Sequence, residues 1–134
     1  MNRRLRAATA VAGALLLAAC APTTYDSSVA TTDAPATSST LPTGTVADLL
    51  PLMLTEVEGL SAKVMAGQGD GEAADRIEQY WAAIQAEVAA DHPEMVEDFE
   101  FVVSRCRLAA DRNRPADADR AAQNMAALVN AYLG

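Results

Sequence analysis

Few residues of this chain are of types that take part directly in catalysis. Its cysteines are Cys20 and Cys106, and its single histidine is His92. A cysteine or serine nucleophile needs a base within hydrogen-bonding reach. Cys106 and Ser104 fall within one predicted helix, whereas His92 lies beyond the opposite end of that helix, so we expect neither nucleophile to be activated. The chain is therefore predicted not to be an enzyme.

Metal binding is the second chemistry that the residue types allow. The thioether sulfurs of Met53 and Met95, together with the imidazole of His92, would form a soft ligand set for copper or for a haem iron. A lone histidine at a helix end is more often a helix cap than a ligand. We therefore expect no cofactor, with haem or copper as the alternative.

The N-terminal end carries the strongest pattern in the sequence. Arg3, Arg4 and Arg6 precede an apolar run from Ala7 to Ala19, which ends in Leu17-Ala18-Ala19-Cys20. Basic residues stay on the cytoplasmic side, the apolar run enters the translocon, and small residues before the cleavage point fit a narrow protease pocket. The pattern resembles the lipobox of bacterial lipoproteins.

This resemblance implies a location. Residues 1–19 would be a cleaved lipoprotein signal peptide, and Cys20 would become the mature N-terminus with a thioether-linked diacylglycerol whose acyl chains are of the palmitate type. The protein is then expected at the cell membrane, lipid-anchored on the extracytoplasmic face within the cell envelope. The alternatives are an ordinary cleaved signal peptide and a membrane-spanning helix, although the apolar run is shorter than the ~20 residues that a spanning helix needs.

Net charge restricts the partners of the mature chain. The full sequence has 10 basic and 18 acidic residues, and removal of Arg3, Arg4 and Arg6 with the leader leaves 7 basic against 18 acidic residues, a net charge of −11. This acidity argues against nucleic acid as a partner and against a domain that lies flat on anionic lipid. Once Cys20 is acylated, Cys106 has no cysteine to pair with, so the fold must depend on its apolar core.

Residues 20–45 differ sharply in composition from residues 46–134. They are rich in Thr, Ser, Pro and Ala, their charged residues are Asp26 and Asp33, and they show no hydrophobic periodicity. Such a composition cannot bury a core and is typical of a flexible spacer. We predict a disordered tether between the lipid and the folded domain.

Residues 46–134 are predicted to form four amphipathic helices. Apolar residues recur at spacings of three and four in each of them, as on one face of a helix: Val46, Leu49, Leu50, Met53, Val57, Leu60 and Val64; Ile77, Trp81, Ile84 and Val88; Met95, Phe99, Val102, Cys106 and Ala109; Ala118, Ala121, Ala122, Met125, Leu128, Val129 and Tyr132. The start of the first helix has two solutions. Thr45 and Asp48 resemble a capping box that places Pro51 inside the helix, whereas a start at Asp48 places Pro51 in the tolerant first turn.

The predicted helices are separated by short breaks. The glycine-rich stretch from Gly67 to Gly71 is expected to end the first helix, and Asp70 within it can cap the second. Pro93 would open the third helix, and Pro115 would open the fourth. Short connections require antiparallel neighbours, so the fold class is all-α, an antiparallel up-down-up-down four-helix bundle. The residues expected to fill its core with the most bulk are Tyr80, Trp81, Phe99 and Phe101, and Met65 and Met125 are also expected there.

Charge is unevenly distributed along the third predicted helix. Acidic residues (Glu94, Glu97, Asp98 and Glu100) crowd its start, and basic residues gather toward its end and beyond. Both groups complement the helix dipole, and this is the simplest interpretation. The alternative is a partner-binding corner for an acidic envelope protein or polymer, formed by an arginine cluster of Arg105, Arg107, Arg112, Arg114 and Arg120.

A second resemblance covers most of residues 46–134. Three short stretches are similar to the soluble periplasmic b-type cytochromes. They are Asp48-Leu49 followed by Met53, Pro93-Glu94-Met95 with Asp98-Phe99, and Asn130-Ala131-Tyr132. That family implies a four-helix fold and a haem held between a methionine of the first helix and a histidine of the fourth. Met53 matches the methionine, but Leu133 stands where the histidine would follow.

Together these patterns predict a lipid-anchored cell-envelope lipoprotein of non-enzymatic, accessory or protein-interaction type. Its partners would be the membrane, through the N-terminal lipid, and another envelope protein. The alternative is a small haem- or metal-binding carrier with a b-type-cytochrome-like fold.

Overall fold

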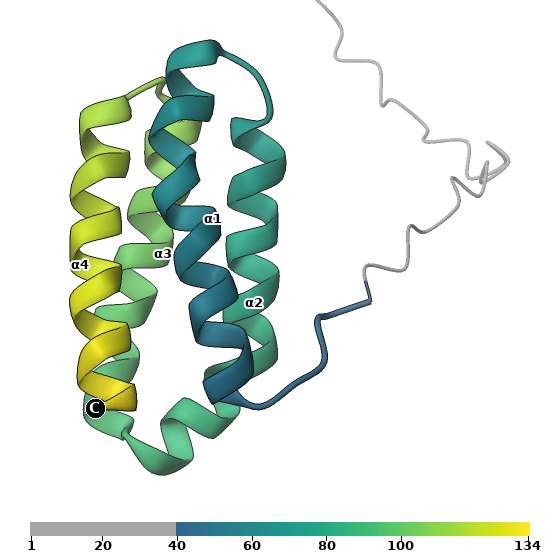
Figure 1. The fold of residues 1–134 in the computed structure, drawn as a ribbon, viewed down its shortest axis with the longest axis vertical. Coiled ribbons are helices and arrows are strands. Elements are labelled where there is room, and N and C mark those ends of the chain that lie inside the picture. Colours follow the sequence, from purple (N-terminus) through teal and green to yellow (C-terminus); the bar gives the residue numbers. More distant parts are fainter. Residues whose placement is uncertain (1–39) are drawn as a thin grey trace, which may run out of the picture. The chain divides into compact units, whose positions relative to one another are not determined.

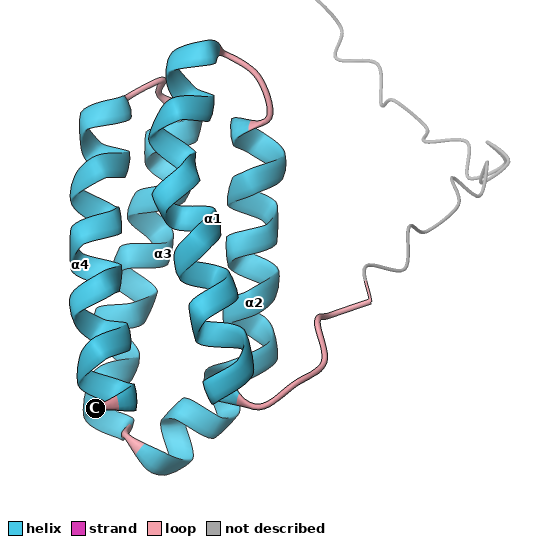
Figure 2. Ribbon diagram, in the orientation of Figure 1, coloured by secondary structure: helices cyan, strands magenta, loops and turns pink. Residues whose placement is uncertain are grey.

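The computed structural model describes residues 40–134, so the predicted signal peptide, Cys20 and most of the predicted tether lie outside the described residues. Four α-helices account for most of the described chain: α1 (Val46–Ala66), α2 (Asp70–Asp91), α3 (Val96–Asp111) and α4 (Pro115–Leu133), with a 3-10 turn, η1 (Pro93–Met95), before α3. Figure 2 shows the four helices joined by loops, with the short helical turn η1 at the α2–α3 corner and no strand in the described part. The all-α fold class is confirmed.

The four helices form an antiparallel up-down-up-down bundle, as predicted. Each helix packs against its neighbour in sequence, α4 packs back against α1, and α1 and α3 meet only weakly across the bundle. The start of α1, the α2–α3 corner and the C-terminus therefore share one end, the lower end in Figure 1. None of the helices in residues 40–134 combines the length and apolar character needed to cross a membrane.

The first helix starts at the earlier of its two candidate positions. The Thr45 side chain accepts a hydrogen bond from the backbone N–H of Asp48 (3.3 Å), and the backbone N–H of Thr45 donates to Asp48 Oδ2 (3.1 Å). This is a complete capping box, and the hydrogen bonds from Thr45 lower the pKa of Asp48. Pro51 is consequently inside α1 on its exposed side, where it has no N–H to donate to the Ala47 carbonyl.

Two turns differ in detail from the predicted ones. The prediction that Asp70 caps α2 is wrong: Gly69 holds the N-cap position with a φ of 75°, and Asp70 is the first helical residue. Gly67, with a φ of 64°, caps α1. Both backbones lie in the left-handed region that glycine favours, so three residues complete the turn. At the next corner Pro93 opens η1 rather than α3 itself.

The core contains nearly all of the predicted apolar residues. Trp81 and Phe99 stack across the α2–α3 interface with ring centroids 5.5 Å apart, and Met53 and Met125 are fully buried. Two core predictions are wrong, because Phe101 is 57% exposed and Met65 is 70% exposed. Residues two positions apart lie on nearly opposite sides of a helix, so Phe99 and Phe101 cannot both face the core.

A three-residue ion cluster ties α1 to α2. Glu56 Oε2 accepts hydrogen bonds from Arg76 Nη2 (2.9 Å) and Lys63 Nζ (3.1 Å). Because these bonds favour the charged carboxylate, with Arg76 contributing most, they lower the pKa of Glu56 below its ordinary value of 4.5.

This lowered pKa predicts a pH-dependent contribution to stability. The contribution of Glu56 is complete above the ordinary glutamate pKa of the unfolded chain and is lost as pH falls through the lower folded-state pKa. Glu56→Gln should therefore reduce the free energy of unfolding at neutral pH, and the difference from wild type should shrink as the pH is lowered below the ordinary glutamate pKa. Urea unfolding followed by circular dichroism measures both. Glu58→Gln, at an exposed position of the same helix, is the control and should show no such trend.

Candidate functional site

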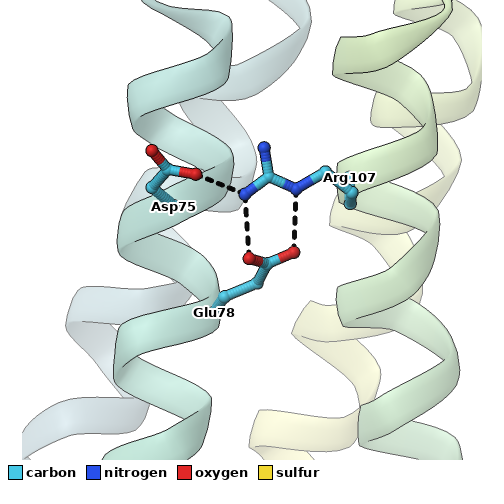
Figure 3. A network of polar contacts seen from close by, with 3 residues as sticks. All are labelled: Asp75, Glu78 and Arg107. Carbon is cyan, nitrogen blue, oxygen red and sulfur yellow. Dashed lines mark hydrogen bonds and ion pairs between the residues drawn. The ribbon is translucent and has the colours of Figure 1, made fainter. Parts of the chain in front are cut away.

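One member of the arginine cluster connects two helices. Arg107 of α3 donates from Nε and Nη2 to the two carboxylate oxygens of Glu78 on α2, each at 2.8 Å, and Nη2 also donates to Asp75. Figure 3 shows the Arg107 side chain reaching from α3 toward the carboxylates of Asp75 and Glu78, which both stand on α2. The hydrogen bonds raise the pKa of Arg107 still further. The positive charge of Arg107 is thus paired with carboxylates of the bundle itself, and its side chain is only 27% exposed.

Two further arginines face a single carboxylate. Asp117, in the first turn of α4, is buried, and its Oδ2 lies 2.9 Å from Arg114 Nε. Its Oδ1 lies 3.8 Å from Arg105 Nη2, a longer and weaker pair. The Arg105 guanidinium also lies 5.8 Å from the centroid of the exposed Phe101 ring, within the range of a cation–π contact.

The other two members of the arginine cluster, Arg112 and Arg120, are exposed, and within residues 40–134 neither forms an ion pair. The cluster is therefore less basic than its sequence suggests, because three of its five charges are matched by carboxylates. The sequence signal for the Arg114 pair was the i, i+3 spacing to Asp117. The Arg107 pair depends on the register of α2 against α3, which spacing along one helix does not reveal.

The three candidate metal ligands occupy different environments. Met53 is fully buried in the core, and Met95 is partly buried against it. His92 Nδ1 lies 3.0 Å from Glu94 Oε1, and the imidazole meets the Tyr132 ring edge-on at 5.0 Å. Its backbone N–H donates to the Val88 carbonyl (2.8 Å) and so caps α2. The described residues contain no group of three or more His, Cys, Asp or Glu that would hold a metal ion.

A haem does not fit the axial residues that the cytochrome resemblance supplies. Leu133, at the position of the histidine, is the last residue of α4 and has only a hydrocarbon side chain. Met53 packs among core residues from the first half of α1. His92 is already hydrogen-bonded to Glu94, whose pKa is lowered by its own backbone N–H and then by His92.

The two candidate nucleophiles of α3 are both held in unreactive states. Cys106 is fully buried, and desolvation raises the pKa of its thiol to about 12, so it is protonated at neutral pH. The Ser104 hydroxyl donates to the Phe101 carbonyl (2.8 Å), a local backbone bond. Cys20 lies outside the described residues.

An open groove, which the sequence did not indicate, lies on the outer surface between α3 and α4. The groove has a volume of about 320 Å³ and is lined by side chains of both helices: Asp98, Phe101 and Val102 from α3, and Asn124, Ala127 and Leu128 from α4. The α4 side chains along this space are exposed or partly exposed and leave it open to solvent beside the Phe101 ring. We call it the α3/α4 groove. An exposed aromatic ring next to a hollow is typical of a protein-binding surface.

Searches of protein-family models, curated proteins and solved structures found no match to this chain.

The bidentate geometry of Arg107 predicts a measurable contribution to stability. Arg107→Ala should lower the free energy of unfolding by about 0.5–1 kcal/mol, because two carboxylates on α2 lose their shared partner. Raising the ionic strength should reduce this difference. Arg112→Ala is the matched control at the end of the same helix and should change stability by less than about 0.5 kcal/mol. If both variants unfold at the same urea concentration, the network contributes nothing.

Proposed function

We propose that this chain is a lipid-anchored accessory lipoprotein of the cell envelope that acts by binding another protein. One observation carries the proposal: the basic residues, apolar run and Leu17-Ala18-Ala19-Cys20 sequence at the N-terminus. Acylation of Cys20 would hold the chain at the extracytoplasmic face of the membrane. Residues 20–45 would then separate the lipid from the bundle.

The topology of the bundle separates two exposed arginines from the end at which the chain enters it. The chain enters α1 at the end that carries the α2–α3 corner, so the opposite end carries the α3–α4 turn with Arg112. Arg120 follows on α4 and is also exposed. We call the surface around Arg112 and Arg120 the arginine end. Charges without internal partners can contact an acidic protein without first breaking an ion pair.

The anchor is tested by changing the cysteine that would carry it. In the native bacterium, Cys20→Ser should move the protein from the membrane fraction to the soluble fraction and abolish incorporation of labelled palmitate. Cys106→Ser is the matched control, because a buried thiol carries no lipid, and this variant should remain in the membrane fraction. Sedimentation of Cys20→Ser with membranes after an alkaline wash would contradict the anchor.

The interaction role predicts a defined contact at the arginine end. A photo-reactive amino acid placed at Arg112 or Arg120 in the full chain should form one crosslinked species of constant mass in intact cells, which mass spectrometry identifies as an envelope protein. The same probe at Glu58, an exposed position of α1, is the control and should not form it. Absence of the species, or its equal appearance at Glu58, would contradict the proposal.

A further inference from the structure

The outer face of α3 combines exposed apolar side chains with a reversal of charge. Phe101 and Leu108 are 57% and 38% exposed and lie seven residues apart, which places them on the same side of the helix. Asp98 precedes Phe101 by three residues and Arg105 follows it by four, so both charges flank the ring on this face. The face is therefore acidic on one side of Phe101 and basic on the other.

Asp98 has no ion-pair partner in the described part of the chain, and Arg105 has only a long ion pair with Asp117 and a cation–π contact with Phe101. Glu100 points toward α2, where its Oε1 accepts a hydrogen bond from Gln85 Nε2 (2.7 Å), and Arg107 is held by Glu78. Asp98 is exposed at the rim of the α3/α4 groove and takes part in no ion pair among residues 40–134. Arg105 reaches its carboxylate only at 3.8 Å and is 40% exposed.

The same surface carries both a projection and a hollow. Phe101 is 57% exposed and forms one wall of the α3/α4 groove, which continues over Val102 to the side chains of α4. In a two-fold symmetric contact each copy presents the same patch, so the projection of one copy enters the hollow of the other, and the reverse. A surface that carries an exposed ring beside a groove can therefore bind a second copy of itself, with each ring in the groove of the other copy.

We propose that the α3/α4 groove binds a second copy of this chain in an antiparallel two-fold dimer, with Phe101 of each copy in the groove of the other and Asp98 of each copy paired with Arg105 of the other. The two charges are seven residues, or about 10.5 Å, apart along α3. A two-fold axis midway between them places each acid opposite the partner's base.

Local charge selects the orientation of this contact. Each copy has a net charge of −8, so two copies repel one another at long range in any orientation, and the attraction must come from local pairs of opposite charge. A parallel arrangement of the two α3 helices would oppose Asp98 to Asp98 and Arg105 to Arg105. The antiparallel arrangement replaces both repulsions with attractions, and charge complementarity of this kind fixes orientation more than affinity.

The contact is small, so the dimer is expected to be weak. One aromatic ring and one flanking ion pair from each copy make a contact at the low end of interface sizes. Weak and transient association is expected for a contact of this kind. This inference does not rest on the lipid anchor, since it concerns only residues of the bundle.

Charge exchange provides the test, with sedimentation velocity of the full chain carrying Cys20→Ser across a concentration series. Asp98→Arg and Arg105→Asp should each weaken self-association at least tenfold. An equimolar mixture of the two variants should restore it, because the partner charges are then opposite at both contacts. Phe101→Ala should weaken it by a similar factor. Circular dichroism melting confirms that each variant is folded.

Matched controls separate this contact from general effects. Glu58→Arg makes the same change in net charge as Asp98→Arg, but on α1, and Met65→Ala removes an exposed apolar side chain at the other end of the bundle. Both should associate like the parent chain. A parent chain that stays monomeric at hundreds of micromolar, a dimer that survives Asp98→Arg with Phe101→Ala, or equal weakening by Glu58→Arg would overturn the proposal. If the Arg105→Asp variant does not fold, because the introduced carboxylate would lie next to Asp117, the self-association of the Asp98→Arg and Phe101→Ala variants still tests the proposal.

Discussion

Burial of one apolar stripe from each of four helices is the constraint on which the rest of this structure depends. A stripe on α1 can be covered only if α2 and α4 lie on either side of it, and the stacked rings of Trp81 and Phe99 bring α2 and α3 together in the same layer. Cys106 is a buried free thiol within this core, so no disulfide supports the described residues. Packing alone must hold the register that every surface contact uses.

The polar surface follows from that register. Once core packing fixes the position of α2 relative to α3 along the helix axes, Asp75 and Glu78 lie opposite Arg107, and Gln85 lies opposite Glu100. The ion pairs occur where helices meet, and the helix faces that meet nothing keep unpaired groups. Thus Asp98, Arg112 and Arg120 have no ion pair among residues 40–134, and Arg105 has only a long one to Asp117. Both proposed contacts use residues of this group.

Helical periodicity was sufficient to predict the fold class, the four helices and most of the core. It failed at Phe101 and Met65, because an apolar residue next to a buried position was counted as core without regard to its angle around the helix. It also could not show that Arg105, Arg107 and Arg114 pair with carboxylates, since two of these pairs join different helices. The α3/α4 groove is formed by side chains of both α3 and α4, a relation between helices that no single segment contains.

Pro51 has a mechanical consequence for a chain that is pulled from its N-terminal side. Tension on residues before Thr45 enters the bundle through the first turns of α1, where the capping box holds the end but the Ala47 carbonyl lacks its usual partner. These turns resist extension with one backbone hydrogen bond fewer than the rest of the helix. The apolar side chains of Val46, Leu49 and Leu50 are buried in these turns and oppose the same tension. Any residue that passed from helix to extended chain would lengthen the connection by roughly 2 Å.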